Sequence, residues 1–82
     1  MYDLARTPKQ LGTTIRRVRK RLGLSQSELG QRVGLRQETI SLIETGNPAT
    51  RLDTLLAVLA ALDLEFRIAV RSGSPDPQEL VG

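Results

Sequence analysis

The feature that most constrains this 82-residue chain is a pair of short helix patterns separated by a glycine. Ser25 and Glu28 have the S-x-x-E spacing of a capping box, which predicts that a helix begins at Ser25. Gly34 can adopt the left-handed conformation that ends this helix and turns the chain. A second helix is expected from about Arg36 to Gly46. Two helices joined by so tight a turn must pack closely against each other.

Further helices are predicted on both sides of this pair. One should run from a Thr7 cap to about Leu22, and another from Arg51 to about Leu62 after a Thr50 cap. The resulting arrangement is a helix-turn-helix unit with flanking helices, and the second helix of such a unit is suited to a DNA major groove. The expected buried stripes are Leu11, Ile15, Val18 and Leu22 in the first helix, Leu29 and Val33 in the second, Ile40 and Ile43 in the third, and Leu52, Leu55, Leu56, Leu59 and Leu62, widened by Val58, in the fourth.

After Asp63 the hydrophobic period changes to two, which predicts a half-buried strand. Its apolar positions are Leu64, Phe66, Ile68 and Val70. Since the sequence has no second strand-like segment, we expect the strand to pair with its copy across the twofold axis of a homodimer. The predicted fold is mainly α, a four- to five-helix DNA-binding domain with one C-terminal β-strand. The predicted divisions are an N-terminal arm at 1–6, the helix-turn-helix domain at 7–63, a dimerisation strand at 64–71 and a disordered tail at 72–82.

The residue inventory argues against catalysis. The chain has no His, no Cys and no G-x-x-x-x-G-K-[ST] loop, which removes the usual general bases, thiol nucleophiles and phosphate cradle. We therefore expect no enzyme activity, no catalytic residue, no cofactor and no metal site. The longest apolar run, 55–62, is too short to span a bilayer. These features predict a cytoplasmic protein, associated with the nucleoid, with no membrane partner.

The distribution of charge favours a nucleic-acid partner. The net charge is +3, and basic residues crowd positions 16–21, whereas acidic residues lie mainly in the C-terminal half. A solvated helix face is the plainer interpretation of such a run. Arg19 differs from its neighbours because it borders the buried stripe, where a charge needs a partner. We expect it to form a structural ion pair with Glu44.

If the unit binds double-stranded DNA, the start of its second helix should read bases. Gln can bond adenine, and Arg guanine, through two hydrogen bonds worth roughly 1–3 kcal/mol of discrimination. The expected base-reading residues are Arg36, Gln37, Glu38 and Ser41, and the expected backbone contacts are Arg16, Arg17, Lys20, Gln26, Ser27, Thr39, Thr45 and Asn47. For Gln26 and Ser27 the alternative role is capping and solvation of the helix end. Leu42 either meets a thymine methyl group or is simply an exposed apolar side chain.

Residues 11–62 resemble the lambda-repressor-like (Xre-type) helix-turn-helix family. The resemblance is densest in LGLSQSELG, which begins at Leu22, and in VGLRQETISLIETG, which begins at Val33. Arg19 and Glu44 stand where related repressors have a buried ion pair. Within the family the chain is most similar to the HipB-type antitoxins, which are small helical proteins with a C-terminal strand that pairs across a dimer, followed by a disordered tail.

This resemblance implies a homodimeric repressor that binds an inverted-repeat operator, represses its own operon and restrains a HipA-like serine/threonine kinase toxin. The family often has Ser or Thr where Arg36 stands, and Ala or Gln where Glu38 stands, so the operator sequence does not carry over. Two alternatives stay open. One is a stand-alone or phage-type repressor without a toxin, and the other is a protein-interaction adaptor that has lost DNA binding.

Overall fold

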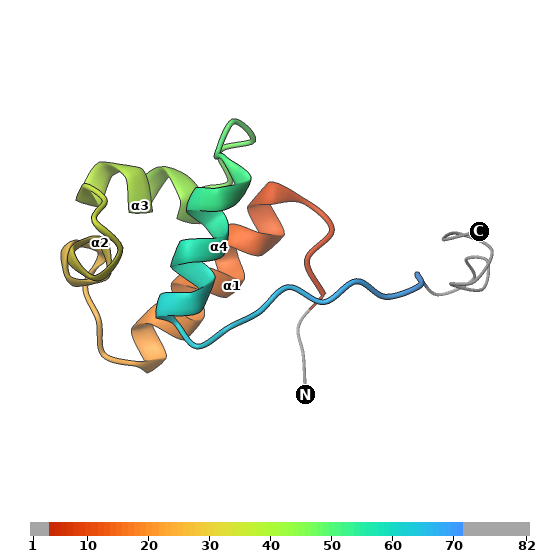
Figure 1. Ribbon diagram of the computed structural model, residues 1–82, viewed down its shortest axis with the longest axis horizontal. Helices are drawn as coiled ribbons and strands as arrows, with labels where there is room; N and C mark the ends of the chain where they lie inside the picture. Colours follow the sequence, from red (N-terminus) through yellow and green to blue (C-terminus); the bar gives the residue numbers. More distant parts are fainter. Residues whose placement is uncertain (1–3, 72–82) are drawn as a thin grey trace.

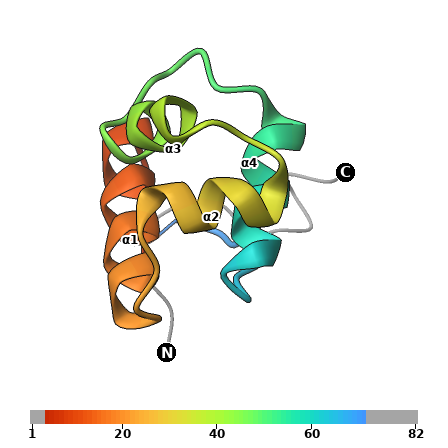
Figure 2. The same cartoon turned by 90° about the vertical axis from the view of Figure 1, so that its left-hand side faces the viewer.

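Four α-helices make up the part of the chain that the computed structural model describes, residues 4–71 (Figure 1). They are α1 (Pro8–Arg21), α2 (Gln26–Val33), α3 (Gln37–Glu44) and α4 (Leu52–Ala61). Figure 2 shows α2 between α1 and α4, with α3 above it. Because α3 packs on both α1 and α2, the helix expected to read DNA is supported from two sides. The mainly helical fold is as predicted.

Local hydrogen bonds explain where the first helices begin and end. The Thr7 hydroxyl accepts a bond from the backbone three residues later and caps α1. Ser25 and Glu28 close the predicted capping box, since each side chain accepts a hydrogen bond from the backbone N–H of the other, at 3.0 and 2.9 Å. Gly34 ends α2 with a φ of 71°, in the left-handed region. These signals depend only on residues a few positions apart, which is why the sequence reveals them.

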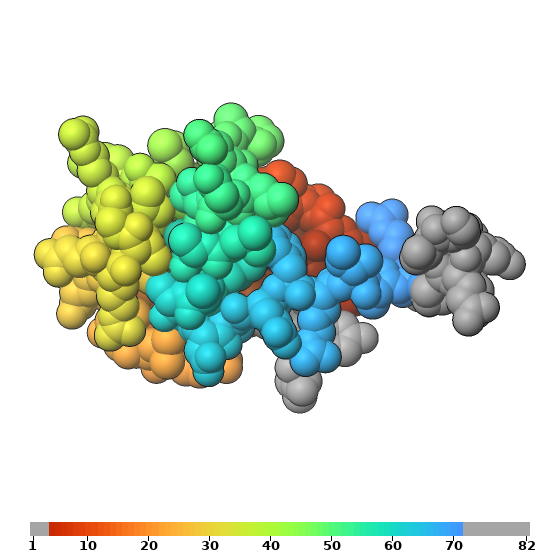
Figure 3. Space-filling view, viewed as in Figure 1, coloured from red at the N-terminus to blue at the C-terminus, as the bar shows by residue number. Residues whose placement is uncertain are grey.

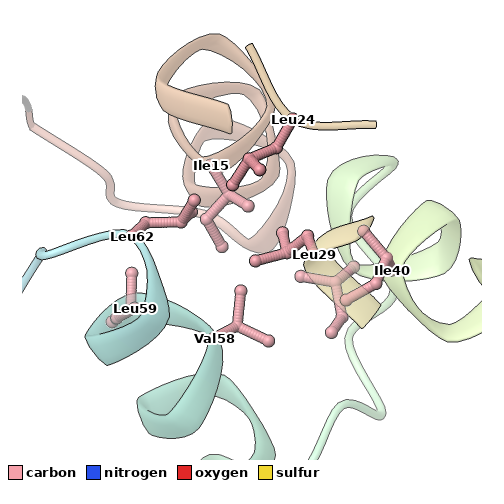
Figure 4. Close-up of a cluster of buried hydrophobic side chains, with 8 residues drawn as sticks. Ile15, Leu24, Leu29, Ile40, Val58, Leu59 and Leu62 are labelled. Atoms are coloured by element: carbon pink, nitrogen blue, oxygen red, sulfur yellow. The ribbon is translucent and has the colours of Figure 1, made fainter. Parts of the chain in front are cut away.

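One apolar core joins the four helices (Figure 4). Ile15, Leu29, Ile40 and Val58, one from each helix, are completely buried at its centre. Val58 was expected only to widen the stripe of α4, and it is the innermost residue of that helix instead. The other core residues are Leu24, Ile43, Leu59 and Leu62.

Several predictions about buried stripes and caps are wrong. Leu22, Leu52 and Leu56 were expected in buried stripes, but they are 52%, 64% and 45% exposed. Thr50 does not cap α4, whose N-cap residue is Arg51 without a side-chain cap bond. Periodicity identifies the inward side of a helix, but it does not say how far the neighbouring elements extend to cover that side.

Residues 64–71, predicted to be a dimerisation strand, form no strand within the described part of the chain. Leu64 packs against the core, whereas Phe66 is 45% exposed and Ile68 fully exposed. The segment leaves α4 as a single trace without a neighbouring strand (Figure 1). Because a strand is defined by hydrogen bonds to a partner, a single copy of this sequence cannot complete one. Residues 1–3 of the predicted arm and the predicted tail at 72–82 lie outside the described residues.

Candidate nucleic-acid interface

A buried ion pair holds the end of α3 against α1. Arg19 donates from Nε to Glu44 Oε2 at 2.6 Å and from Nη2 to Glu44 Oε1 at 3.0 Å. Its Nη1 donates to the Leu24 carbonyl at 2.8 Å. The hydrogen bonds to Glu44 raise the pKa of the Arg19 guanidinium, and burial opposes them more weakly. The expected pairing of Arg19 with Glu44 is therefore present, and its two-point geometry fixes the position of α3.

Gly12 provides a second constraint on α3. A Cβ atom at this position would lie 2.5 Å from the carbonyl oxygens of both Ile43 and Glu44, so only glycine allows α1 and α3 to approach this closely. This role of Gly12 was not predicted from the sequence. The available signal was a glycine in the interior of an otherwise strong helix pattern, which often marks a close backbone approach.

Gln26 takes part in the same buried network. Its Nε2 donates to Glu44 Oε1 at 3.2 Å, and the side chain is half-buried at the first turn of α2. The sequence predicted a contact with the DNA backbone for Gln26, or else capping and solvation of the helix end. It did not predict the bond to Glu44, because no local pattern shows that the start of α2 lies beside the end of α3. Ser27, the next candidate for a backbone contact, is exposed.

The first turn of α3 faces solvent. Arg36 is the N-cap residue and makes no side-chain cap bond, and Gln37 and Glu38 follow it at exposed positions. The first turn lies at the N-terminal end of α3, whereas Glu44 holds the C-terminal end. The ion pair that fixes the helix therefore does not cover the side chains of the first turn. Figure 3 shows the residues around the start of α3, in yellow-green, at the surface of the molecule.

The remaining candidates in α3 and in the turn after it differ in how exposed their side chains are. Ser41 and Thr39 are half-buried, and Thr45 is exposed. The Thr45 hydroxyl donates to the carbonyls of residues 41 and 42, both at 3.1 Å, so only its acceptor lone pairs remain free for a donor. Asn47 is half-buried and its Oδ1 accepts from the Ala49 N–H at 3.1 Å, which leaves its amide hydrogens for an outside acceptor.

The basic candidates of α1 are exposed to solvent. Arg16, Arg17 and Lys20 all lie on the outer side of α1. Arg17 lines a shallow groove formed by α1 and the segment before it, and no residue of α3 lines that groove.

Residues 4–71 contain no group of three or more His, Cys, Asp or Glu side chains placed to hold a metal ion. Within the same range, no helix is long and apolar enough to cross a membrane.

The chain is similar to known proteins in both sequence and structure. The helix-turn-helix family model HTH_3 matches residues 15–68. Antitoxin HipB of Escherichia coli K12 is 34% identical over 74 residues, which span 89% of this chain and 84% of the relative. Two solved structures, a HipA-HipB-O2-O3 complex and a HipB-O4 20mer complex, each superimpose with a TM-score of 0.80 at 31% identity, covering 87% of this chain and 100% of the matched chain.

The sequence and structural matches agree on the same helices and extend beyond the turn itself. A family model that covers 15–68 includes the ion pair, the glycine turn and the exposed start of α3. The identity to HipB continues through most of both chains. The chain therefore belongs to the Xre-type helix-turn-helix family, among its HipB-like members.

Proposed function

We propose that this chain is a homodimeric, sequence-specific DNA-binding repressor and the antitoxin of a HipBA-like toxin–antitoxin pair. The observation that carries the proposal is the exposed first turn of α3 on a HipB-like frame. Arg19, Glu44 and Gly12 fix the position of that helix, so its backbone needs little rearrangement when it meets DNA.

In this proposal the start of α3 enters a major groove. The base-reading residues are Arg36, Gln37, Glu38 and Ser41, and the backbone contacts are Arg16, Arg17, Lys20, Gln26, Ser27, Thr39, Thr45 and Asn47. Gln26 uses one amide hydrogen on Glu44 and has a second for a phosphate oxygen, which would link the DNA backbone to the network that positions α3. Neutralisation of phosphates by the basic residues predicts affinity that falls as salt rises.

Replacing Gln37 by Ala tests the base-reading role. Loss of a two-point contact should weaken binding to the preferred duplex by about 5- to 150-fold and relax discrimination at one base pair. Gln31→Ala, the same change at an exposed position of α2, is the matched control and should bind as the wild type does. Fluorescence anisotropy on specific and random duplexes at two salt concentrations measures both quantities. Unchanged affinity and base discrimination in Gln37→Ala would rule out its role, and a wild type without any sequence preference would favour the adaptor alternative.

The homodimer in this proposal forms through residues 64–71. Ile68 is fully exposed in the single chain and Phe66 is half-exposed, as expected of side chains that a second copy would cover. Pairing of the two segments would close a ribbon across a twofold axis and place two α3 helices about 34 Å apart, to match an inverted repeat. Ile68→Pro deletes a backbone donor and should dissociate the dimer, whereas Ile68→Val should not. A sedimentation measurement that finds Ile68→Pro still dimeric would refute this mode of assembly.

The toxin partner in this proposal is a HipA-like kinase, by similarity to the protein in the HipA-HipB-O2-O3 complex. Purification of the chain from its native cells should recover such a kinase, identified by mass spectrometry. Recovery of a DNA-binding dimer without a kinase would favour the stand-alone repressor instead.

A further inference from the structure

The outermost side of α3 is not the side that carries Gln37 and Ser41. With about 100° between successive residues of a helix, Glu38, Leu42 and Thr45 lie opposite the buried Ile40 and Ile43. If this surface meets a major groove, Glu38 and Leu42 point most directly into it.

Glu38 has an exposed carboxylate without a hydrogen bond or ion pair among residues 4–71. A negative charge at the first turn of a helix is stabilising, which is one explanation for a glutamate at position 38. On the side of α3 that would face the groove, the same carboxylate would also come near the DNA. Close to phosphates, an ionised carboxylate is unfavourable unless a donor on a base edge compensates it.

Leu42 lies four residues after Glu38, so the two side chains are neighbours on one surface. Leu42 is 52% exposed, although the adjacent Ile43 is only 4% exposed. A single exposed leucine is ordinary in a folded protein. Beside a carboxylate on a surface that enters a groove, it supplies an apolar contact, and the thymine methyl is the group in the major groove that such a contact suits.

We propose that Glu38 and Leu42 together select a cytosine and a nearby thymine in the operator. The carboxylate only accepts hydrogen bonds, and cytosine offers the N4 amino group as donor. Adenine also has an amino donor, but its N7 acceptor lies beside it and would repel the second carboxylate oxygen. Residues four apart are separated by about 6 Å along a helix, and base pairs by about 3.4 Å, so the thymine lies one or two base pairs from the cytosine. This inference rests on the proposed DNA-binding function.

The first test combines selection from a random duplex pool with the variant Glu38→Gln. The wild-type protein should select a half-site with a cytosine and, within two base pairs, a thymine. In Glu38→Gln the preference at the cytosine position should change to adenine, because glutamine offers both a donor and an acceptor to that base. The preference for thymine should stay, and Gln31→Ala should retain both preferences. A cytosine preference that survives in Glu38→Gln would overturn the role of the carboxylate.

The second test isolates the methyl contact. Substitution of deoxyuridine for each thymine in turn removes only the C5-methyl group. Wild-type binding should weaken about fourfold at one position, and Leu42→Ala should be insensitive to the same substitution. Thermal unfolding should show that both variants remain folded. Wild-type tolerance of deoxyuridine at every position would overturn the role of Leu42. Specific binding without these effects refutes only this inference, whereas binding without any sequence preference refutes the proposed function as well.

Discussion

Removing one half of the Arg19–Glu44 ion pair should destabilise the protein far more than replacing both halves. Each residue is 6% exposed, so Glu44→Leu leaves a buried guanidinium unpaired, and Arg19→Met leaves a buried carboxylate unpaired. Each change should cost about 3–5 kcal/mol. The double variant Arg19→Met/Glu44→Leu removes both charges. Two losses remain: the Leu24 carbonyl loses its donor, and the half-buried Gln26 amide, which water can still reach, loses its acceptor. The buried Leu24 carbonyl accounts for most of the remaining cost, about 1–3 kcal/mol, which is well below the roughly 6–10 kcal/mol expected if the single losses were additive.

Urea denaturation at one fixed protein concentration measures these differences, since association alters apparent stability. With a slope of about 1 kcal/mol per molar urea, each single variant should shift the midpoint by about 3–5 M, and the double variant by about 1–3 M. A single variant that is unfolded without urea agrees with the prediction provided that the double variant folds. A double variant as unstable as the sum of its parents would refute the reasoning, because the two charges would then be independent.

Three further predictions concern stability. Gly12→Ala should cost about 1–3 kcal/mol, visible as a lower Tm, because the new Cβ would lie 2.5 Å from two carbonyl oxygens. Asp63 has a φ of 59°, a left-handed conformation that strains residues with a Cβ atom, so Asp63→Gly should raise stability by about 0.5–1 kcal/mol. The control Ala60→Gly, within α4, should lower stability by about as much. Lower stability in both variants would contradict strain at Asp63. Hydrogen bonds from Ser25 lower the pKa of Glu28 in the folded protein below its ordinary 4.5. The stability that ionised Glu28 adds is therefore fully present above pH 4.5, and it is lost as the pH falls through the lowered pKa of the folded protein. The wild type should therefore exceed Glu28→Gln in urea midpoint at pH 7 and lose that advantage near pH 3, and a difference independent of pH would contradict the assignment.

Short-range signals account for what the sequence predicted well. The capping box at Ser25 and Glu28 and the left-handed turn at Gly34 depend on backbone geometry within a few residues. The pairing of Arg19 with Glu44 could be predicted because an arginine beside a buried stripe requires a partner. The outward start of α3 followed from the same helical period that buries Ile40.

Contacts between elements account for what the sequence did not reveal. The tight approach at Gly12 and the bond from Gln26 to Glu44 arise only when α1, α2 and α3 have packed together. The exposure of Leu52 depends on how far the neighbouring helices extend, which no pattern within α4 records. The segment 64–71 has the alternation of a strand, but its backbone hydrogen bonds need a second chain. Local conformation is encoded in neighbouring residues, whereas burial and pairing depend on which distant surfaces come together.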